Sequence, residues 1–173
     1  NNVSLEDSTS SATVAKYFVT VYKVDADNYT KHLSGAGFQL ESYDKTTSSW
    51  VPFNSYTTAA DGTITIARST MTEDLLYRLT ESSAPSGYLK SSESYYFVLL
   101  ASGQTKTAAI NAMTQAAFGG VSTDSVRFFS SSGAIYVPNI NTSLSVSKLW
   151  ADQAGDSVAP PVDSVTLDLY QQA

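Results

Sequence analysis

Three polar residues lie at the ends of predicted strands, each on a strand face that is otherwise apolar. They carry an amine, a carboxyl group and a carboxamide, which can exchange protons and form hydrogen bonds with one another. They are Lys23, Glu81 and Asn139. Successive side chains of a strand point to opposite faces, so residues two and four positions before each of them share its face. Those neighbours are apolar: Val19 and Val21, Tyr77 and Leu79, Ile135 and Val137. The alternation therefore directs one lysine, one acid and one amide toward the interior.

Any one of these residues alone is readily explained as a polar group at a strand end that reaches solvent, as lysine does easily. The three, however, come from the first, a middle and the last strand predicted for one module. This coincidence makes Lys23, Glu81 and Asn139 the candidate site. Asn141 has the same parity as Asn139 and is the alternative amide.

Other chemical sites find little support. The sequence contains no Cys and one His, which excludes disulfides, thiolate zinc sites and His-rich metal centres. It contains no nucleotide-binding loop and no nucleophile elbow. The run from Asp25 to Asn28 resembles the start of a calcium loop, but Thr30 replaces the required Gly and Ala36 the final acid. We expect no metal and no cofactor, and we expect His32 to be solvated.

Composition narrows the class of protein. The 173 residues carry Lys+Arg 10 against Asp+Glu 16, a net charge of -6 that argues against nucleic-acid binding. A hydrophobic fraction of 42% allows a core, and no apolar stretch approaches the roughly 18 residues of a membrane span. About a quarter of the residues are Ser or Thr, and Tyr and Phe are frequent. This balance is typical of an all-β exported protein.

The elements that must position the site are mostly strands. Residues 1–13 are polar and aperiodic and are interpreted as a lead-in. Alternating runs follow at 16–24, 38–44, 63–67, 74–81, 94–101, 126–129 and 134–139. The turn at Ala60-Asp61-Gly62 predicts a hairpin, or a closely related connection, between Trp50–Val51 and Thr63–Ala67. Residues 105–118 are Ala-rich, with Ile110, Met113 and Ala117 on one helical face, and predict a short surface helix at one edge or end.

Several of these segments resemble the collagen-adhesin B-type domain, a prealbumin-like β-sandwich of Gram-positive pilins and surface proteins. Residues 21–40 resemble its opening, Tyr77–Tyr88 with the pattern Glu-x-x-Ala-Pro-x-Gly-Tyr resemble its acid-containing box, and 135–139 resemble its closing strand. The resemblance covers residues 14–141 and implies an immunoglobulin-like or prealbumin-like all-β sandwich. The Ala-rich segment 104–133 departs from it, because it is longer than the usual connection and adds a small helical insertion.

Residues 142–173 resemble the first strands of a second, incomplete B-type module. Leu144, Val146 and Trp150 share one face with Lys148, and Val165, Leu167 and Leu169 form another apolar face. A hairpin alone is marginal in water. We therefore expect its edges to pair with another copy, with the first module or with residues beyond this chain, and Lys148 to stay uncrosslinked.

The family resemblance implies an intramolecular isopeptide bond between Lys23 and Asn139, assisted by Glu81. Lys23 must be neutral to attack the amide carbon, and burial favours neutral forms of amines and acids. A protonated Glu81 can then donate a hydrogen bond to the amide carbonyl and pass protons to the departing ammonia. The reaction occurs once per molecule, so the chain is not expected to be an enzyme with turnover.

These features lead to two expectations about function. The first is a structural or adhesive module of a Gram-positive pilus or cell-surface protein, located in the cell wall, with other pilin or surface-protein subunits as partners. The second is a ligand-binding adhesin whose 104–133 insertion contacts a host glycan or matrix protein. No nucleic-acid binding and no membrane insertion are expected. Shaft, tip and non-pilus stalk remain open alternatives.

Overall fold

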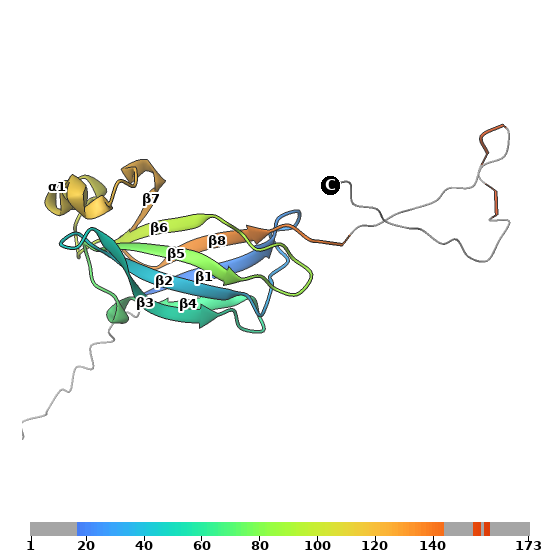
Figure 1. Cartoon of the computed structure of the whole chain (residues 1–173), viewed down its shortest axis with the longest axis horizontal. Helices are drawn as coiled ribbons and strands as arrows, with labels where there is room; N and C mark the ends of the chain where they lie inside the picture. Colours follow the sequence, from blue (N-terminus) through green and yellow to red (C-terminus); the bar gives the residue numbers. More distant parts are fainter. Residues whose placement is uncertain (1–16, 144–153, 157, 160–173) are drawn as a thin grey trace, which may run out of the picture. The chain divides into compact units, whose positions relative to one another are not determined.

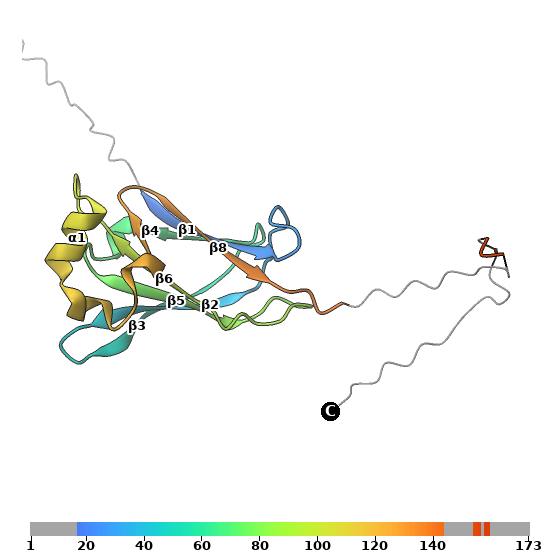
Figure 2. The same ribbon diagram turned by 90° about the horizontal axis from the view of Figure 1, so that it is seen from above.

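The computed structural model describes residues 17–143, 154–156, 158 and 159. Its strands form two sheets that pack face to face as a sandwich (Figures 1 and 2). The three-stranded sheet has the order β4 (Thr63–Ala67), β1 (Phe18–Asp25) and β8 (Gly133–Asn139). The five-stranded sheet has the order β3 (Ser49–Thr57), β2 (Gly37–Asp44), β5 (Leu76–Ser83), β6 (Ser94–Leu99) and β7 (Val126–Phe129). The predicted β-sandwich is confirmed.

The first and last strands of the module are neighbours. β1 pairs with β8 in parallel, and the register places Lys23 opposite Val137 and Asp25 opposite Asn139. Two parallel strands need a long connection, and here it is the rest of the sandwich. The chain therefore enters this sheet at the start of β1 and leaves it at the far end of β8.

The inward-facing side chains of both sheets fill the space between them. The inward-facing residues of both sheets are almost completely buried and form one cluster that includes Val19, Val21, Phe38, Leu40, Tyr77, Leu79, Phe97, Leu99, Ile135 and Val137. β-branched and aromatic side chains suit such a pleated, buried surface. The apolar faces predicted for β1, β5 and β8 are thus the faces that form the core.

The predicted hairpin across Asp61-Gly62 is wrong. β3 pairs with β2 in the five-stranded sheet, whereas β4 pairs with β1 in the other sheet. Gly62 takes a left-handed φ of 73°, and its carbonyl accepts a hydrogen bond from the Lys23 backbone N–H. The turn therefore carries the chain across the sandwich. Ile64 and Ile66 point inward and are buried beside β1. β3 is a mostly exposed edge strand and would not bury them in this way.

The predicted surface helix is present. α1 (Lys106–Met113) is capped by Thr105, whose hydroxyl accepts a hydrogen bond from the Ala108 N–H, and a 3-10 turn follows at Gln115–Phe118. Further 3-10 turns lie at Arg68–Thr70 and Thr123–Ser125. Met113 and Phe118 pack on Leu76 and other residues of the five-stranded sheet. The helix covers this sheet at one end of the sandwich (Figure 1).

Some predictions fall on residues outside those described. The lead-in at 1–13 and the expected strands of the second module, with Lys148, are among them. The compact unit that holds the sandwich ends at Thr142. No helix in the described part of the chain is long and apolar enough to span a bilayer.

Candidate functional site

The three predicted site residues lie together inside the sandwich. Lys23 comes from β1, Asn139 ends the neighbouring β8, and Glu81 reaches them from β5 of the facing sheet. Their exposed fractions are 0%, 2% and 4%, so all three are cut off from solvent. Buried groups of this polarity are rare unless they are paired.

The contacts between them centre on the carboxyl group of Glu81. The Nδ2 of Asn139 donates a hydrogen bond to Oε1 of Glu81 at 2.9 Å, and the Nζ of Lys23 lies 3.8 Å from the same oxygen. Lys23 Nζ also donates to the backbone carbonyl of Val137 at 2.7 Å. The other carboxyl oxygen, Oε2, accepts a hydrogen bond from the Ser91 N–H at 2.6 Å. One carboxyl group thus contacts both the amine and the amide.

The environment disfavours the charged lysine. Desolvation by burial lowers the pKa of Lys23 from 10.5 to about 8, even though the nearby Glu81 carboxylate acts in the opposite direction. At pH 7 roughly one Lys23 amine in ten is then neutral and has a free lone pair. A lysine in water would be neutral roughly once in a few thousand molecules. Burial therefore makes Lys23 a far better nucleophile than an exposed lysine.

The amide of Asn139 is incompletely satisfied. Its Oδ1 is buried and has no hydrogen-bond partner among the described residues. A buried acceptor without a partner costs free energy, about 1–3 kcal/mol. A half-turn of the amide would exchange the places of Nδ2 and Oδ1 and direct Oδ1 toward Glu81.

The alternative amide lies outside this cluster. Asn141 forms an isolated antiparallel bridge with Tyr88 beyond the end of β8 and is partly exposed. Asn139 is therefore the amide that the structure brings to Lys23 and Glu81.

Backbone groups also hold the site, and the sequence pattern did not predict them. The carbonyl of Val137 and the N–H of Ser91 carry no side-chain signature. The calcium-like start also has another role. The Asp25 carboxylate accepts hydrogen bonds from the Asp27 N–H and the Tyr88 hydroxyl and pairs with Lys31. The described residues contain no group of side chains able to hold a metal ion.

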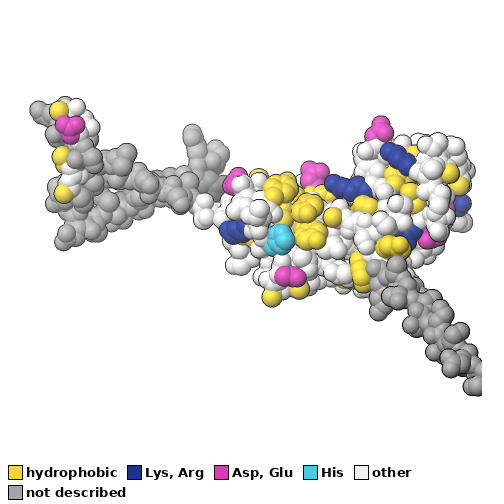
Figure 3. Space-filling model, turned by 180° about the vertical axis from the view of Figure 1, so that it is seen from behind, with side chains coloured by type: hydrophobic (Ala, Val, Ile, Leu, Met, Phe, Trp, Pro, Cys, Tyr) yellow, Lys and Arg dark blue, Asp and Glu magenta, His cyan; other side chains and the backbone are white. Residues whose placement is uncertain are grey.

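His32 lies at the edge of an aromatic row. Tyr22 and Tyr136 stack with ring centres 4.8 Å apart on the outer face of the three-stranded sheet, flanked by His32 and Tyr29. Figure 3 shows hydrophobic side chains gathered beside the histidine on this face. The histidine is exposed, as predicted, and its Nδ1 lies 3.2 Å from the Asp61 carbonyl.

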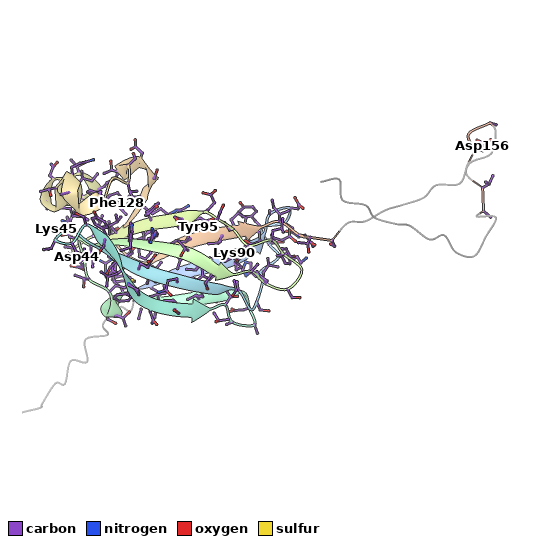
Figure 4. All side chains as sticks on the ribbon, viewed as in Figure 1. Asp44, Lys45, Lys90, Tyr95, Phe128 and Asp156 are labelled. Carbon is purple, nitrogen blue, oxygen red and sulfur yellow. The ribbon has the colours of Figure 1, made fainter. Side chains whose placement is uncertain are left out.

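A cavity lies at the α1 end of the sandwich. Its volume is about 520 Å³, and it is bordered by the end of β2, the residues before β5 and the helix, including Asp44, Lys45, Asp74 and Met113. Figure 4 shows Asp44 and Lys45 at this end of the sandwich.

The family model described as "SpaA: Prealbumin-like fold domain" matches residues 18–113. No curated protein matches the chain.

Several solved structures of pilins are similar. The pilus 2b backbone protein of group B streptococcus is 26% identical, with a TM-score of 0.43 over 75% of this chain and 43% of its own. Domains D2 and D3 of the major pilin SpaD of Corynebacterium diphtheriae are 18% identical, with a TM-score of 0.42 over 73% and 47%. The shaft pilin SpaA of Lactobacillus rhamnosus GG is 18% identical, with a TM-score of 0.45 over 75% and 49%. The chain spans less than half the length of each.

Proposed function

The chain belongs to the SpaA family of prealbumin-like fold domains, and from this premise we propose that it is a structural module of a Gram-positive pilus or cell-surface protein. In this proposal an isopeptide bond between Lys23 and Asn139 forms inside the folded module and locks its first strand to its last. The observation that carries the proposal is the buried contact of an amine and an amide with one carboxyl group.

The proposed reaction needs no added reagent. The lone pair of neutral Lys23 Nζ attacks Cγ of Asn139, and a C–N bond forms. The bond from Cγ to Nδ2 then breaks, and the nitrogen leaves as ammonia. Glu81 accepts a proton from the attacking nitrogen and delivers it to the departing one, so that charge and atoms balance. Orientation of two groups held in contact can contribute roughly 7–11 kcal/mol to such a step.

The carbonyl oxygen of Asn139 also needs a donor during the reaction, because negative charge develops on it. The proton that Glu81 takes from the attacking nitrogen supplies that donor once the amide has turned to face it. The buried Oδ1 without a partner is the reason for this assignment. Glu81 then has two roles: it stabilises the oxyanion and relays the proton.

The topology makes this position mechanically useful. Because β1 and β8 are parallel, tension on the chain pulls the start of β1 and the end of β8 in opposite directions. A bond from Lys23 to Asn139 passes this tension straight from one strand to the other. The residues between them, which include the rest of the sandwich, carry no load. A chain without cysteine gains in this way a crosslink that reducing conditions do not break.

The test is the intact mass and heat stability of the purified chain and of Glu81→Ala. The wild type is expected to weigh one ammonia less than its sequence, and Glu81→Ala to have the full sequence mass, a folded spectrum and a lower melting temperature. Lys45→Ala, at an exposed lysine, serves as control and keeps the mass deficit. A wild type with the full sequence mass contradicts the proposal.

Ligand binding at the 104–133 insertion is the second candidate, favoured by the cavity beside α1. It predicts binding to a host glycan or matrix protein that is lost when 104–133 is shortened and kept in Glu81→Ala. Binding that survives the shortening, or no binding at all, contradicts it.

A further inference from the structure

The loop between β5 and β6 is fastened to the segment that follows β8. The Leu89 N–H donates to the Ile140 carbonyl at 2.9 Å, and the Thr142 N–H donates to the Gly87 carbonyl at 2.9 Å. Between these two bonds, Tyr88 bridges Asn141. The loop thus pairs in antiparallel fashion with residues 140–142, just after the end of β8.

The opposite edge of the same segment is held by the extension of β1. The Ala26 N–H donates to the Asn139 carbonyl at 2.9 Å. The backbone at Asn139 and Ile140 is therefore hydrogen-bonded on both sides, to the extension of β1 on one side and to the loop on the other. These bonds limit the positions that the Asn139 amide can take.

A side-chain contact ties the loop to β1 as well. The Tyr88 hydroxyl donates to Oδ2 of Asp25 at 2.8 Å, and the Lys31 ammonium lies 3.3 Å from the same oxygen. Lys31 also lies over the Tyr88 ring, 5.5 Å from its centre. The Asp27 N–H and then the Tyr88 hydroxyl hold the pKa of Asp25 below its ordinary value, so the acceptor is ionised at neutral pH. Hydrogen bonds to charged groups are the stronger ones.

The same loop also reaches the acid. The Ser91 N–H donates to Oε2 of Glu81 at 2.6 Å, three residues after Tyr88. One loop therefore contacts the strand of Lys23 through Asp25, the strand of Asn139 through Ile140, and Glu81 itself. No other loop in the described part of the module forms hydrogen bonds to all three.

We propose that residues 85–91 form a clamp that aligns the amine, the amide and the acid before the bond forms, and that Tyr88 is its positioning residue. The inference rests on the proposed isopeptide reaction. Tyr88 does not touch the reacting atoms; it acts by holding β1 and the loop at a fixed separation. Its loss slows bond formation in molecules that are already folded.

The experiment follows bond formation in newly made full-length chain. Cell-free synthesis is stopped, folded molecules are selected by protease resistance, and the fraction that has lost one ammonia is read from intact mass over time. Tyr88→Phe, which removes only the hydroxyl, is expected to form the bond about tenfold more slowly. This is the lower end of the range for losing a hydrogen bond to a charged group. Tyr136→Phe, which removes a hydroxyl from the outer face of the same sheet, is the matched control and keeps the wild-type rate.

Two further variants separate positioning from stability. Asp25→Asn removes the charge and keeps the shape of the side chain, and it is expected to slow bond formation. The double variant with Tyr88→Phe is expected to be no slower than the slower of the two single variants. In a Lys23→Met background, where no bond forms, Tyr88→Phe measures the loss of stability alone. The clamp is overturned if folded Tyr88→Phe molecules form the bond at the wild-type rate and Tyr88→Phe only lowers stability in the Lys23→Met background. A wild type that never loses ammonia refutes the isopeptide bond instead.

Discussion

Removal of the lysine should convert an inextensible module into an extensible one. Lys23 and Asn139 are 116 positions apart, from 23 to 139. At about 3.3–3.6 Å per residue, the enclosed chain has a contour length of about 400 Å. With the bond in place, only about eight residues of the sandwich lie outside that loop, at 18–22 and 140–142, and they release less than about 30 Å. Lys23→Met therefore adds roughly 400 Å to the extension of a pulled module.

The assay is single-molecule stretching of the full chain through handles at its two ends. Wild type is expected to show no unfolding step near 400 Å at any force below rupture, and Lys23→Met to show one such step. Lys45→Met, at an exposed lysine in the turn after β2, is the control and behaves as wild type. A step of about 400 Å in wild type would refute the reasoning, because the enclosed residues would then carry the load.

The remaining predictions concern stability and pH. In Glu81→Gln we expect no bond, and the loss of a crosslink that closes a 116-residue loop should lower the free energy of unfolding by about 5 kcal/mol and the melting temperature in calorimetry by about 15–20 °C. The double variant with Lys23→Met should melt near the single variants, and additive losses would contradict a shared bond. Because the pKa of Lys23 is about 8, the rate of bond formation should rise about tenfold per pH unit up to pH 8 and then level off, whereas a flat profile from pH 6 to 8 excludes a lysine nucleophile. In the uncrosslinked variant Asn139→Ala, the pKa of Lys23 is lower in the folded state than its unfolded value of 10.5, so Lys23 destabilises the folded state fully below pH 8 and no longer does so by pH 10.5. Urea unfolding should therefore show the free energy of unfolding rising between pH 8 and 10.5, relative to the same variant with Lys23→Met. Gly62→Ala places a Cβ 2.6 Å from the Leu33 nitrogen at a φ of 73°, and should cost about 1–3 kcal/mol by the same measurement; an unchanged midpoint would show that the turn can relax.

Strand parity predicted the part of the site that side chains encode. Lys23, Glu81 and Asn139 each end an alternating apolar run, and alternation with period two fixes which face a residue occupies wherever one face is buried. The family resemblance supplied the expectation that Lys23, Glu81 and Asn139 act together, which parity alone does not contain. Together they located three residues that lie 58 or more positions apart in the chain.

The groups that hold the site were not predictable in this way. Ser91 and Leu89 contribute backbone N–H groups, which every residue except proline possesses, so their identity carries no signal. The hairpin error has a related cause. An Asp-Gly turn fixes the local bend at Gly62 but not which sheet the next strand joins, and that choice depends on the burial of Ile64 and Ile66 against β1.

Fragment mass spectrometry of the digested wild-type chain tests the central claim most directly. The proposal predicts one branched peptide in which Lys23 Nζ is joined to the Asn139 side chain, with a mass one ammonia below the sum of its two arms, and its absence from Glu81→Ala. Recovery of unmodified linear peptides that contain Lys23 and Asn139 as the major products from wild type would contradict it.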